Sequence, residues 1–230
     1  MTHQPADISD DPSNLPKLPA WVTSQRAETL ETVAFRSGAA LTVLDGLVSD
    51  PTHDVPLKLL VNQLALKVAA STSKLEGRLA READIRDAFH LTPPGEARGP
   101  DGDLLAFWRT AARLRLTGRD WQVALKALVG SDLELEVDGW LQSTASRSQT
   151  YGPLAGCVAV MRAVLEVDDR AERVACLLSD VTLARALNWQ TVLPVSAQRL
   201  SKVMLRDLFA EGQGGELAVQ QRLLGSLEDT

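Results

Sequence analysis

The stretch Leu57–Leu75, LKLLVNQLALKVAASTSKL, decides the fold. Apolar residues recur in it every three or four positions, which is the spacing that gathers side chains on one face of an α-helix. A second apolar stripe runs beside the first, and a helix that is apolar on two sides is usually buried. The first stripe is Leu57, Val61, Leu64, Val68 and Leu75, and the second is Leu59, Leu66 and Ala70. We therefore predict that residues 57–75 form the central helix of an all-α protein.

The residues on either side support further helices. Asp54 can cap the helix at 57–75, and Pro56 suits its first turn because proline lacks an N–H there. Before it, an apolar pattern predicts a helix over 24–48, which Asp50-Pro51 ends. The prolines and glycines of 92–102 predict a loop. Further helices are predicted at 81–90, from Asp101 or Asp103 to near Gly118, at 121–129, 153–165 and 169–184, from Pro194 to Phe209, and after Gly215.

Residues 131–147 support two interpretations. Leu133 to Asp138 alternate as a β-strand would, whereas Ser131-x-x-Glu134 is a capping box that predicts a helix start. Leu133, Val137 and Leu141 also share one helical face. We favour the helix, because the chain offers no second strand to pair with this one.

Together these patterns predict an all-α fold, a single orthogonal bundle of about nine or ten helices around a buried central helix. Residues 1–20 contain four prolines and little apolar sequence, so we predict a flexible tail there. Residues 21–230 are predicted to be a single helical domain.

Composition bounds the class of protein. The 230 residues are 45% hydrophobic and 23% charged, within the range of globular proteins. No signal peptide and no apolar run long enough to span a membrane is recognisable, so we expect a soluble cytoplasmic protein without a membrane partner. Cys157 and Cys176 are then expected to be reduced, buried thiols. The net charge of −6 argues against general nucleic-acid binding, although a local basic patch is compatible with it.

The motifs of common enzymes and cofactor sites are missing from the sequence. It has no glycine-rich dinucleotide or phosphate loop and no zinc spacing, so we expect no cofactor and no metal. The candidate for catalysis is Asp84, Asp87 and His90, in which Asp87 and His90 lie three residues apart on one helix face. A carboxylate–imidazole pair can orient a general base. The simpler interpretation is a histidine that ends a helix, where the helix dipole favours it.

A second candidate is a set of arginines between Arg78 and Arg119. These side chains could form an anion or nucleic-acid patch, or simply a solvated helix face with ordinary pairs such as Arg81 with Asp84. The predicted binding residues are Arg78, Arg81, Arg86, Arg109 and Arg113.

The segment Gly77–Trp108 resembles a bacterial family of unknown function, domain-of-unknown-function family 1403. The resemblance rests on Gly77-Arg78, the run from Ile85 to Leu91, the Pro/Gly loop from Pro93 to Gly102, and Leu104 to Arg109. Weaker similarity reaches 39–45 and 178–194. The resemblance implies an all-α bacterial protein, often plasmid-borne, from a mobile or accessory replicon, and it assigns no catalytic residue.

Three functions are compatible with these observations. The first is a helical interaction or regulatory protein without catalytic activity, which binds a protein partner. The second is a protein that binds nucleic acid or another anion through the Arg78–Arg119 surface. The third is a helical enzyme centred on Asp87 and His90. We favour the first, because the catalytic motifs are missing.

Overall fold

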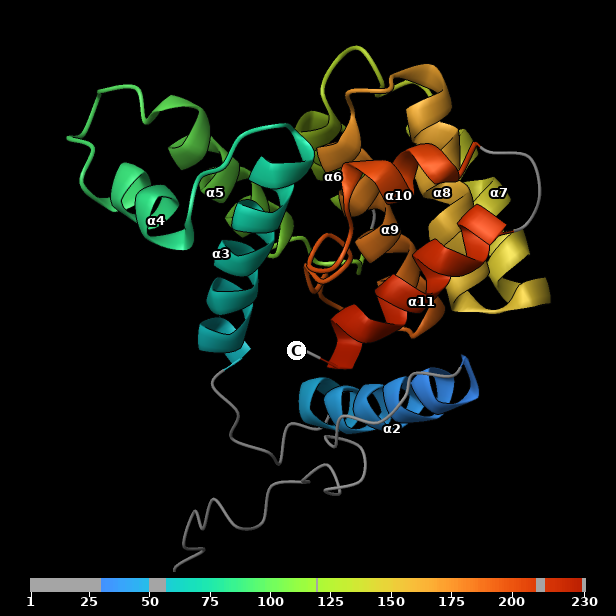
Figure 1. Cartoon of the computed structure of the whole chain (residues 1–230). Helices are drawn as coiled ribbons and strands as arrows, with labels where there is room; N and C mark the ends of the chain where they lie inside the picture. The colour runs from blue at the N-terminus through green and yellow to red at the C-terminus, as the bar shows by residue number, and fades with distance from the viewer. Residues whose placement is uncertain (1–29, 50–56, 119, 210–213, 229–230) are drawn as a thin grey trace, which may run out of the picture.

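The computed structural model describes residues 30–49, 57–118, 120–209 and 214–228, and within them the chain forms ten α-helices and no strand (Figure 1). This confirms the predicted all-α bundle. The helices are α2 (Leu30–Ser49), α3 (Leu57–Leu75), α4 (Glu82–His90), α5 (Gly99–Ala111), α6 (Trp121–Val129), α7 (Val137–Tyr151), α8 (Pro153–Val167), α9 (Glu172–Ala186), α10 (Lys202–Asp207) and α11 (Gly214–Glu228). The predicted tail at 1–20, the start of the first helix at 24 and the caps at 54–56 lie outside the described residues.

The central place in the bundle belongs to α9 rather than to α3. Every residue of α9 from Val174 to Ala184 is buried, among α3, α7 and α8. By contrast, α3 is buried mainly from Leu64 onward, and Leu59 near its start is 63% exposed. Periodicity showed that α3 has two apolar stripes, but which helix is surrounded depends on how the helices pack.

The start of α5 shows why the predicted loop at 92–102 ends early. The helix begins at Gly99, because Pro100 fits the first turn and Gly102 allows α5 to approach α4. A Cβ atom at Gly102 would lie 3.0 Å from the carbonyl oxygen of Ala88. Gly102 therefore allows two helices to pack closely, whereas the sequence placed it in a loop.

The end of α5 also differs from the prediction. The helix stops at Ala111 instead of continuing toward Gly118. Arg115 then forms an isolated antiparallel bridge with Thr191, and the backbone N–H of Leu116 donates to the carbonyl of Gln190 at 2.9 Å. A contact with a segment some 75 residues away replaces the last helical turns.

Two helices begin later than the sequence predicted. The prediction of a helix over 131–147 is right from Val137 onward, where α7 begins, and its start at Ser131 is wrong. Residues 131–136 form turns, which are neither helix nor strand. The Ser131 hydroxyl donates to Asp132 and caps no helix. Likewise, α9 begins at Glu172, three residues after the predicted start at Asp169.

The predicted helix from Pro194 to Phe209 is mostly absent. Residues Thr191 to Ala197 are buried without helical structure, and α10 covers only Lys202–Asp207. The Ser201 hydroxyl caps α10 by accepting from the Met204 N–H at 3.3 Å. A buried non-helical segment needs partners for its backbone groups, and Asp180 of α9 supplies some of them.

The two ends of the described chain meet. In Figure 1, α2 lies beside α11, and these helices contact each other. The Trp189 indole N–H donates to the carboxylate of Asp45 in α2 at 2.6 Å. One apolar core cluster includes residues from Leu44 to Leu227. Within the described ranges, no helix combines the length and apolar character needed to cross a membrane.

Candidate functional site

The corner between α4 and α5 is where the predicted site residues concentrate. Ile85 is fully buried and anchors α4 to the core. The Asp84 carboxylate accepts from the backbone N–H of Arg81 at 3.1 Å and so caps the start of the helix. In Figure 1, the loop that joins α4 to α5 reaches outward at the edge of the molecule. The last turn of α4, with Phe89 and His90, lies at this edge.

The ring of Phe89 is flanked by two arginines. The guanidinium carbons of Arg98 and Arg109 lie 4.8 and 4.7 Å from the ring centroid, within the range of cation–π attraction. The His90 ring meets the same phenyl ring edge-on, with 5.0 Å between centroids. Arg113, one turn after Arg109, adds a fourth group that can carry positive charge. We refer to Phe89, His90, Arg98, Arg109 and Arg113 as the Phe89 corner.

Arg98, Arg109 and Arg113 form no ion pair among the described residues. The Nε of Arg109 is out of solvent and has no hydrogen-bond partner. Burial lowers the pKa of Arg109, and the charge of Arg113 lowers it further. A negative charge placed here would oppose both effects, because it favours the charged form of the guanidinium.

The other predicted arginines are engaged by carboxylates. Arg81 pairs with Asp84 at 3.1 Å, and Arg86 pairs with Asp87 at 3.0 Å. Hydrogen bonds from the side chain and from the backbone N–H of Arg81 lower the pKa of the Asp84 carboxyl. Of the five predicted binding residues, the structure therefore brings only Arg109 and Arg113 together in the Phe89 corner.

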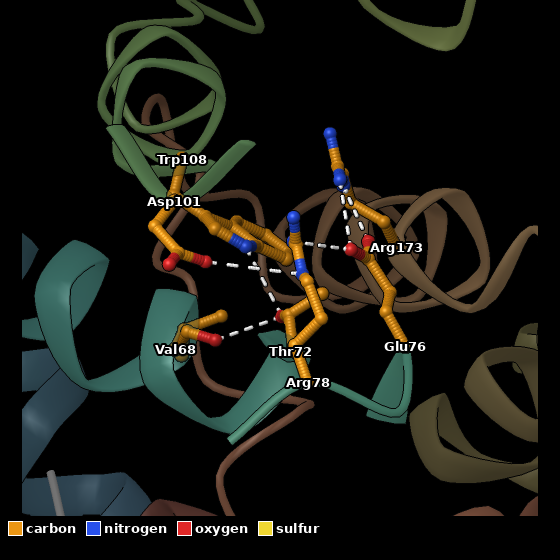
Figure 2. A network of polar contacts seen from close by, with 7 residues as sticks. All are labelled: Val68, Thr72, Glu76, Arg78, Asp101, Trp108 and Arg173. Carbon is orange, nitrogen blue, oxygen red and sulfur yellow. Dashed lines mark hydrogen bonds and ion pairs between the residues drawn. The ribbon is translucent and has the colours of Figure 1, made fainter. Parts of the chain in front are cut away.

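Arg78 belongs to a different network, which joins α3, α5 and α9 (Figure 2). It pairs with Glu76 at 2.6 Å and lies 3.8 Å from Asp101. The same glutamate accepts two hydrogen bonds from Arg173, at 2.7 and 3.0 Å. These groups connect segments 97 residues apart, and they hold helices together rather than leaving a cation free for a ligand.

A buried hydrogen bond lies beside this network. The Trp108 indole N–H donates to the Thr72 hydroxyl at 3.1 Å, and that hydroxyl donates to the carbonyl of Val68 at 2.7 Å (Figure 2). Both side chains are fully buried. Their polar groups already have hydrogen-bond partners, so they offer no site for a ligand.

The candidate catalytic residues do not form one cluster. Asp84 bonds to Arg81 and Asp87 accepts from Arg86, whereas no hydrogen bond joins Asp87 to His90. His90 is exposed and contacts Phe89. Among the described residues, no group of three His, Cys, Asp or Glu side chains could hold a metal ion. The catalytic role of these residues stays a prediction.

Sequence reasoning missed two polar features. Arg98 was not a predicted binding residue, because it lies in a loop and its approach to Phe89 depends on the turn between α4 and α5. Asp180 was also missed, although a single carboxylate within the apolar run from Val174 to Ala184 was a detectable signal. Burial raises the pKa of Asp180 to about 7.

Comparison with known proteins places the chain in a family. A family described as "Protein of unknown function (DUF1403)" matches residues 6–230. No curated protein and no solved structure matches the chain. The match extends well beyond Gly77–Trp108, where the sequence showed its most specific resemblance, and covers all ten described helices. The chain therefore belongs to the DUF1403 family.

Proposed function

We propose that this protein is a non-catalytic interaction protein that binds an acidic segment of a protein partner through the Phe89 corner. The observation that carries the proposal is the convergence of Arg98 and Arg109 on the Phe89 ring, where neither has an ion-pair partner in the described part of the chain. Guanidinium groups can bind a carboxylate by donating two parallel hydrogen bonds to it.

The surroundings of the corner suit a protein partner. Leu91 follows His90 directly and is 75% exposed, so an apolar side chain lies beside the cations. Arginines and aromatic residues contribute disproportionately to the binding energy of protein interfaces. The contacts with the Phe89 ring also restrain Arg98 and Arg109 before binding, which reduces the entropy that association would cost.

Nucleic acid is the second candidate for the same surface. Exposed carboxylates of Asp84, Asp87 and Glu96 lie on the same helix and loop as the corner. They would repel a continuous phosphate backbone but leave room for one or two carboxylates from a peptide. The net charge of −6 also opposes the binding of a phosphate backbone. The family resemblance implied an association with a mobile or accessory bacterial replicon. We include that association in the proposal of a non-catalytic interaction protein.

A binding assay with matched variants tests the proposal. The probes are a fluorescent Glu-rich peptide and a fluorescent DNA duplex, each titrated with the full chain at low salt. We expect the peptide to bind more tightly than the duplex. The double variant Arg98→Gln/Arg113→Gln should weaken peptide binding by about tenfold or more, because each lost charge-assisted hydrogen bond is worth about 1.5–3 kcal/mol.

The control variant is Arg81→Gln/Arg86→Gln. It removes the same charge from the same region, but its arginines are already paired with Asp84 and Asp87. It should change peptide affinity by about twofold or less. Equal losses in both variants would indicate general electrostatics and contradict the proposal. Tighter binding of the duplex would favour the nucleic-acid candidate.

A further inference from the structure

The turn between α6 and α7 presents negative charge. Residues 131–136 carry carboxylates at alternate positions, on Asp132, Glu134 and Glu136. Asp132 accepts a hydrogen bond from the Ser131 hydroxyl at 3.3 Å, and none of the three carboxylates forms an ion pair within the described ranges. We refer to residues 131–136 as the acidic turn. It has the composition of the acidic segment that we propose as the partner of the Phe89 corner.

The backbone of the acidic turn is fixed before any partner binds. The N–H groups of Leu133 and Glu134 both donate to the carbonyl of Gly130, at 3.3 and 3.0 Å. The N–H of Glu136 donates to the carbonyl of Leu133 at 3.1 Å. Leu133 is 6% exposed and anchors the turn in the core. An ordered turn loses less entropy on association than a mobile segment would.

Each of the two surfaces also presents an apolar side chain beside its charges. Leu135 lies between Glu134 and Glu136 in the sequence and is 86% exposed. On the Phe89 corner, Leu91 follows His90 and is 75% exposed. Covering an exposed leucine with a partner is favourable, because apolar surface leaves water. The Phe89 corner and the acidic turn therefore match in charge, and each adds an apolar contact.

The two surfaces do not meet within one molecule. Arg98, Arg109 and Arg113 form no ion pair with a described carboxylate, so none of them binds the acidic turn of its own chain. In Figure 1, the loop between α4 and α5 projects at the left edge, whereas the loop between α6 and α7 projects at the top. A contact between them therefore requires two copies of the chain.

We infer that the protein self-associates, with the Phe89 corner of one copy bound to the acidic turn of another. This inference rests on the function proposed above and names the acidic partner as a second copy of the chain. Carboxylates of the turn accept hydrogen bonds from the guanidinium groups of the corner. A contact made by one turn and one corner is small, so the association is weak and reversible.

Sedimentation velocity of the full chain over a range of concentrations measures this association. The net charge of −6 repels copies from one another, so ionic strength matters. At about 0.1 M salt the Debye length is about 10 Å, which screens distant charges but not pairs in contact. We expect the average mass to rise with protein concentration there. At about 1 M salt, where the Debye length is about 3 Å, it should return toward that of the monomer.

Charge reversal with rescue is the decisive experiment. Arg98→Glu/Arg113→Glu reverses the corner, and each arginine then faces a carboxylate-rich turn as a carboxylate. Glu134→Arg/Glu136→Arg reverses the turn. Each variant alone should self-associate at least about tenfold more weakly, because like charges then face each other. The turn variant makes the chain less negative, so relief of general repulsion would instead strengthen its association.

A mixture of the two charge-reversal variants should associate again. The negative corner of one then faces the positive turn of the other, and the positive corner faces the negative turn. Misfolding of either variant cannot produce this rescue. Absence of rescue, or wild-type self-association in Glu134→Arg/Glu136→Arg, would show that other surfaces are responsible and would overturn the inference.

Leu135→Ser tests the apolar part of the contact. The side chain is mostly in solvent, so its replacement should leave thermal stability unchanged. Self-association should weaken by about fivefold or more, because burial of this leucine is lost. The matched control is Leu59→Ser, the same change at a position on α3 that is 63% exposed. It should leave self-association unchanged, and an equal loss in both variants would contradict the inference.

The Glu-rich peptide distinguishes this inference from the function proposed for the Phe89 corner. Peptide binding by a chain that stays monomeric at millimolar concentration would overturn the inference and leave the proposed function intact. A monomeric chain that also fails to bind the peptide would overturn both.

Discussion

At the scale of single residues, Asp180 is the group whose chemistry burial changes most. One of its carboxylate oxygens accepts from the N–H groups of Val195 and Ser196 and from the Ser196 hydroxyl, at 3.1, 2.8 and 2.7 Å. The other oxygen is buried without a partner. Desolvation raises the pKa of Asp180 to about 7, although these hydrogen bonds lower it in part. The carboxyl is therefore mostly protonated in mildly acidic solution.

This pKa predicts how stability depends on pH. Between about pH 4 and pH 7, the unfolded chain has released the proton of Asp180 and the folded chain still holds it. The contribution of this group to the free energy of unfolding therefore falls as pH rises through this window, and it levels off above about pH 7. The full change is about 4 kcal/mol for a shift of about three pKa units. Urea unfolding across the window measures it.

Asp180→Asn is the matching variant, because an amide resembles the protonated carboxyl and does not ionise. We expect its stability to be flat across the same pH window where that of the wild-type protein declines. Its stability at neutral pH should equal or exceed that of the wild-type protein. An unchanged pH dependence in Asp180→Asn would show that another group is responsible.

Thr72 provides a second prediction at the residue scale. Replacing it by Val leaves the buried Trp108 N–H without an acceptor, so the free energy of unfolding should fall by about 1–3 kcal/mol. Thr110→Val is the control. The exposed hydroxyl of Thr110 donates to the carbonyl of Ala106 in its own helix, as the Thr72 hydroxyl does to Val68, but it accepts no bond from a tryptophan. Chemical denaturation of both variants tests this. A similar small loss in both would show that the Trp108 contact contributes little.

At the scale of helices, two glycines should respond oppositely to the same substitution. Gly102 sits where α5 crosses α4, and an added Cβ would lie 2.6 Å from the Cβ of Arg98 and 3.0 Å from the Ala88 carbonyl oxygen. Gly102→Ala should therefore cost about 1–3 kcal/mol, because one helix must shift. Gly139 in α7 has open space around it, so Gly139→Ala should stabilise by up to about 1 kcal/mol.

Thermal unfolding of the two glycine variants provides the measurement. The Gly102 variant should also weaken peptide binding at the Phe89 corner, since moving α5 displaces Arg109 relative to Phe89. Stabilisation by both substitutions would mean that the helices move apart without cost. In that event, the close approach of α4 and α5 would not hold the corner in place.

At the scale of the whole molecule, hydrogen bonds between distant segments hold helices that pack at the periphery. The bond from Trp189 to Asp45 connects α2 to the segment after α9 across 144 residues. Asp45→Ala should therefore accelerate amide hydrogen exchange in α2 by at least about tenfold, because a bond to a charged acceptor is worth about 1.5–3 kcal/mol. Exchange in α8 and α9 should not change.

Asp45→Asn is the control for this prediction, because its amide oxygen can still accept from the Trp189 N–H. Mass spectrometry of the exchanged protein should show α2 protected more strongly in this variant than in Asp45→Ala. Uniform acceleration across α2, α8 and α9 would indicate global destabilisation. That result would contradict a local role for the contact.

The sequence by itself determined the all-α class and the position of most helices. The periodicity of Leu57–Leu75 and the proline at the start of α8 are local signals, and a helix satisfies its backbone hydrogen bonds within one segment. The sequence also indicated the region of the candidate site, since Arg109 and Arg113 were predicted binding residues. Its family resemblance was confirmed over residues 6–230.

Only the tertiary structure decided which helix is central, where several helices end and which charges remain free. Helix α5 stops at Ala111 because Arg115 meets Thr191, and 191–197 is not helical where Asp180 binds its backbone. The cation–π contacts of Phe89 arise in the same way, from a loop that brings Arg98 back over α4. All these features depend on contacts between residues that are separate along the chain, and sequence periodicity reports only on neighbours within a few turns.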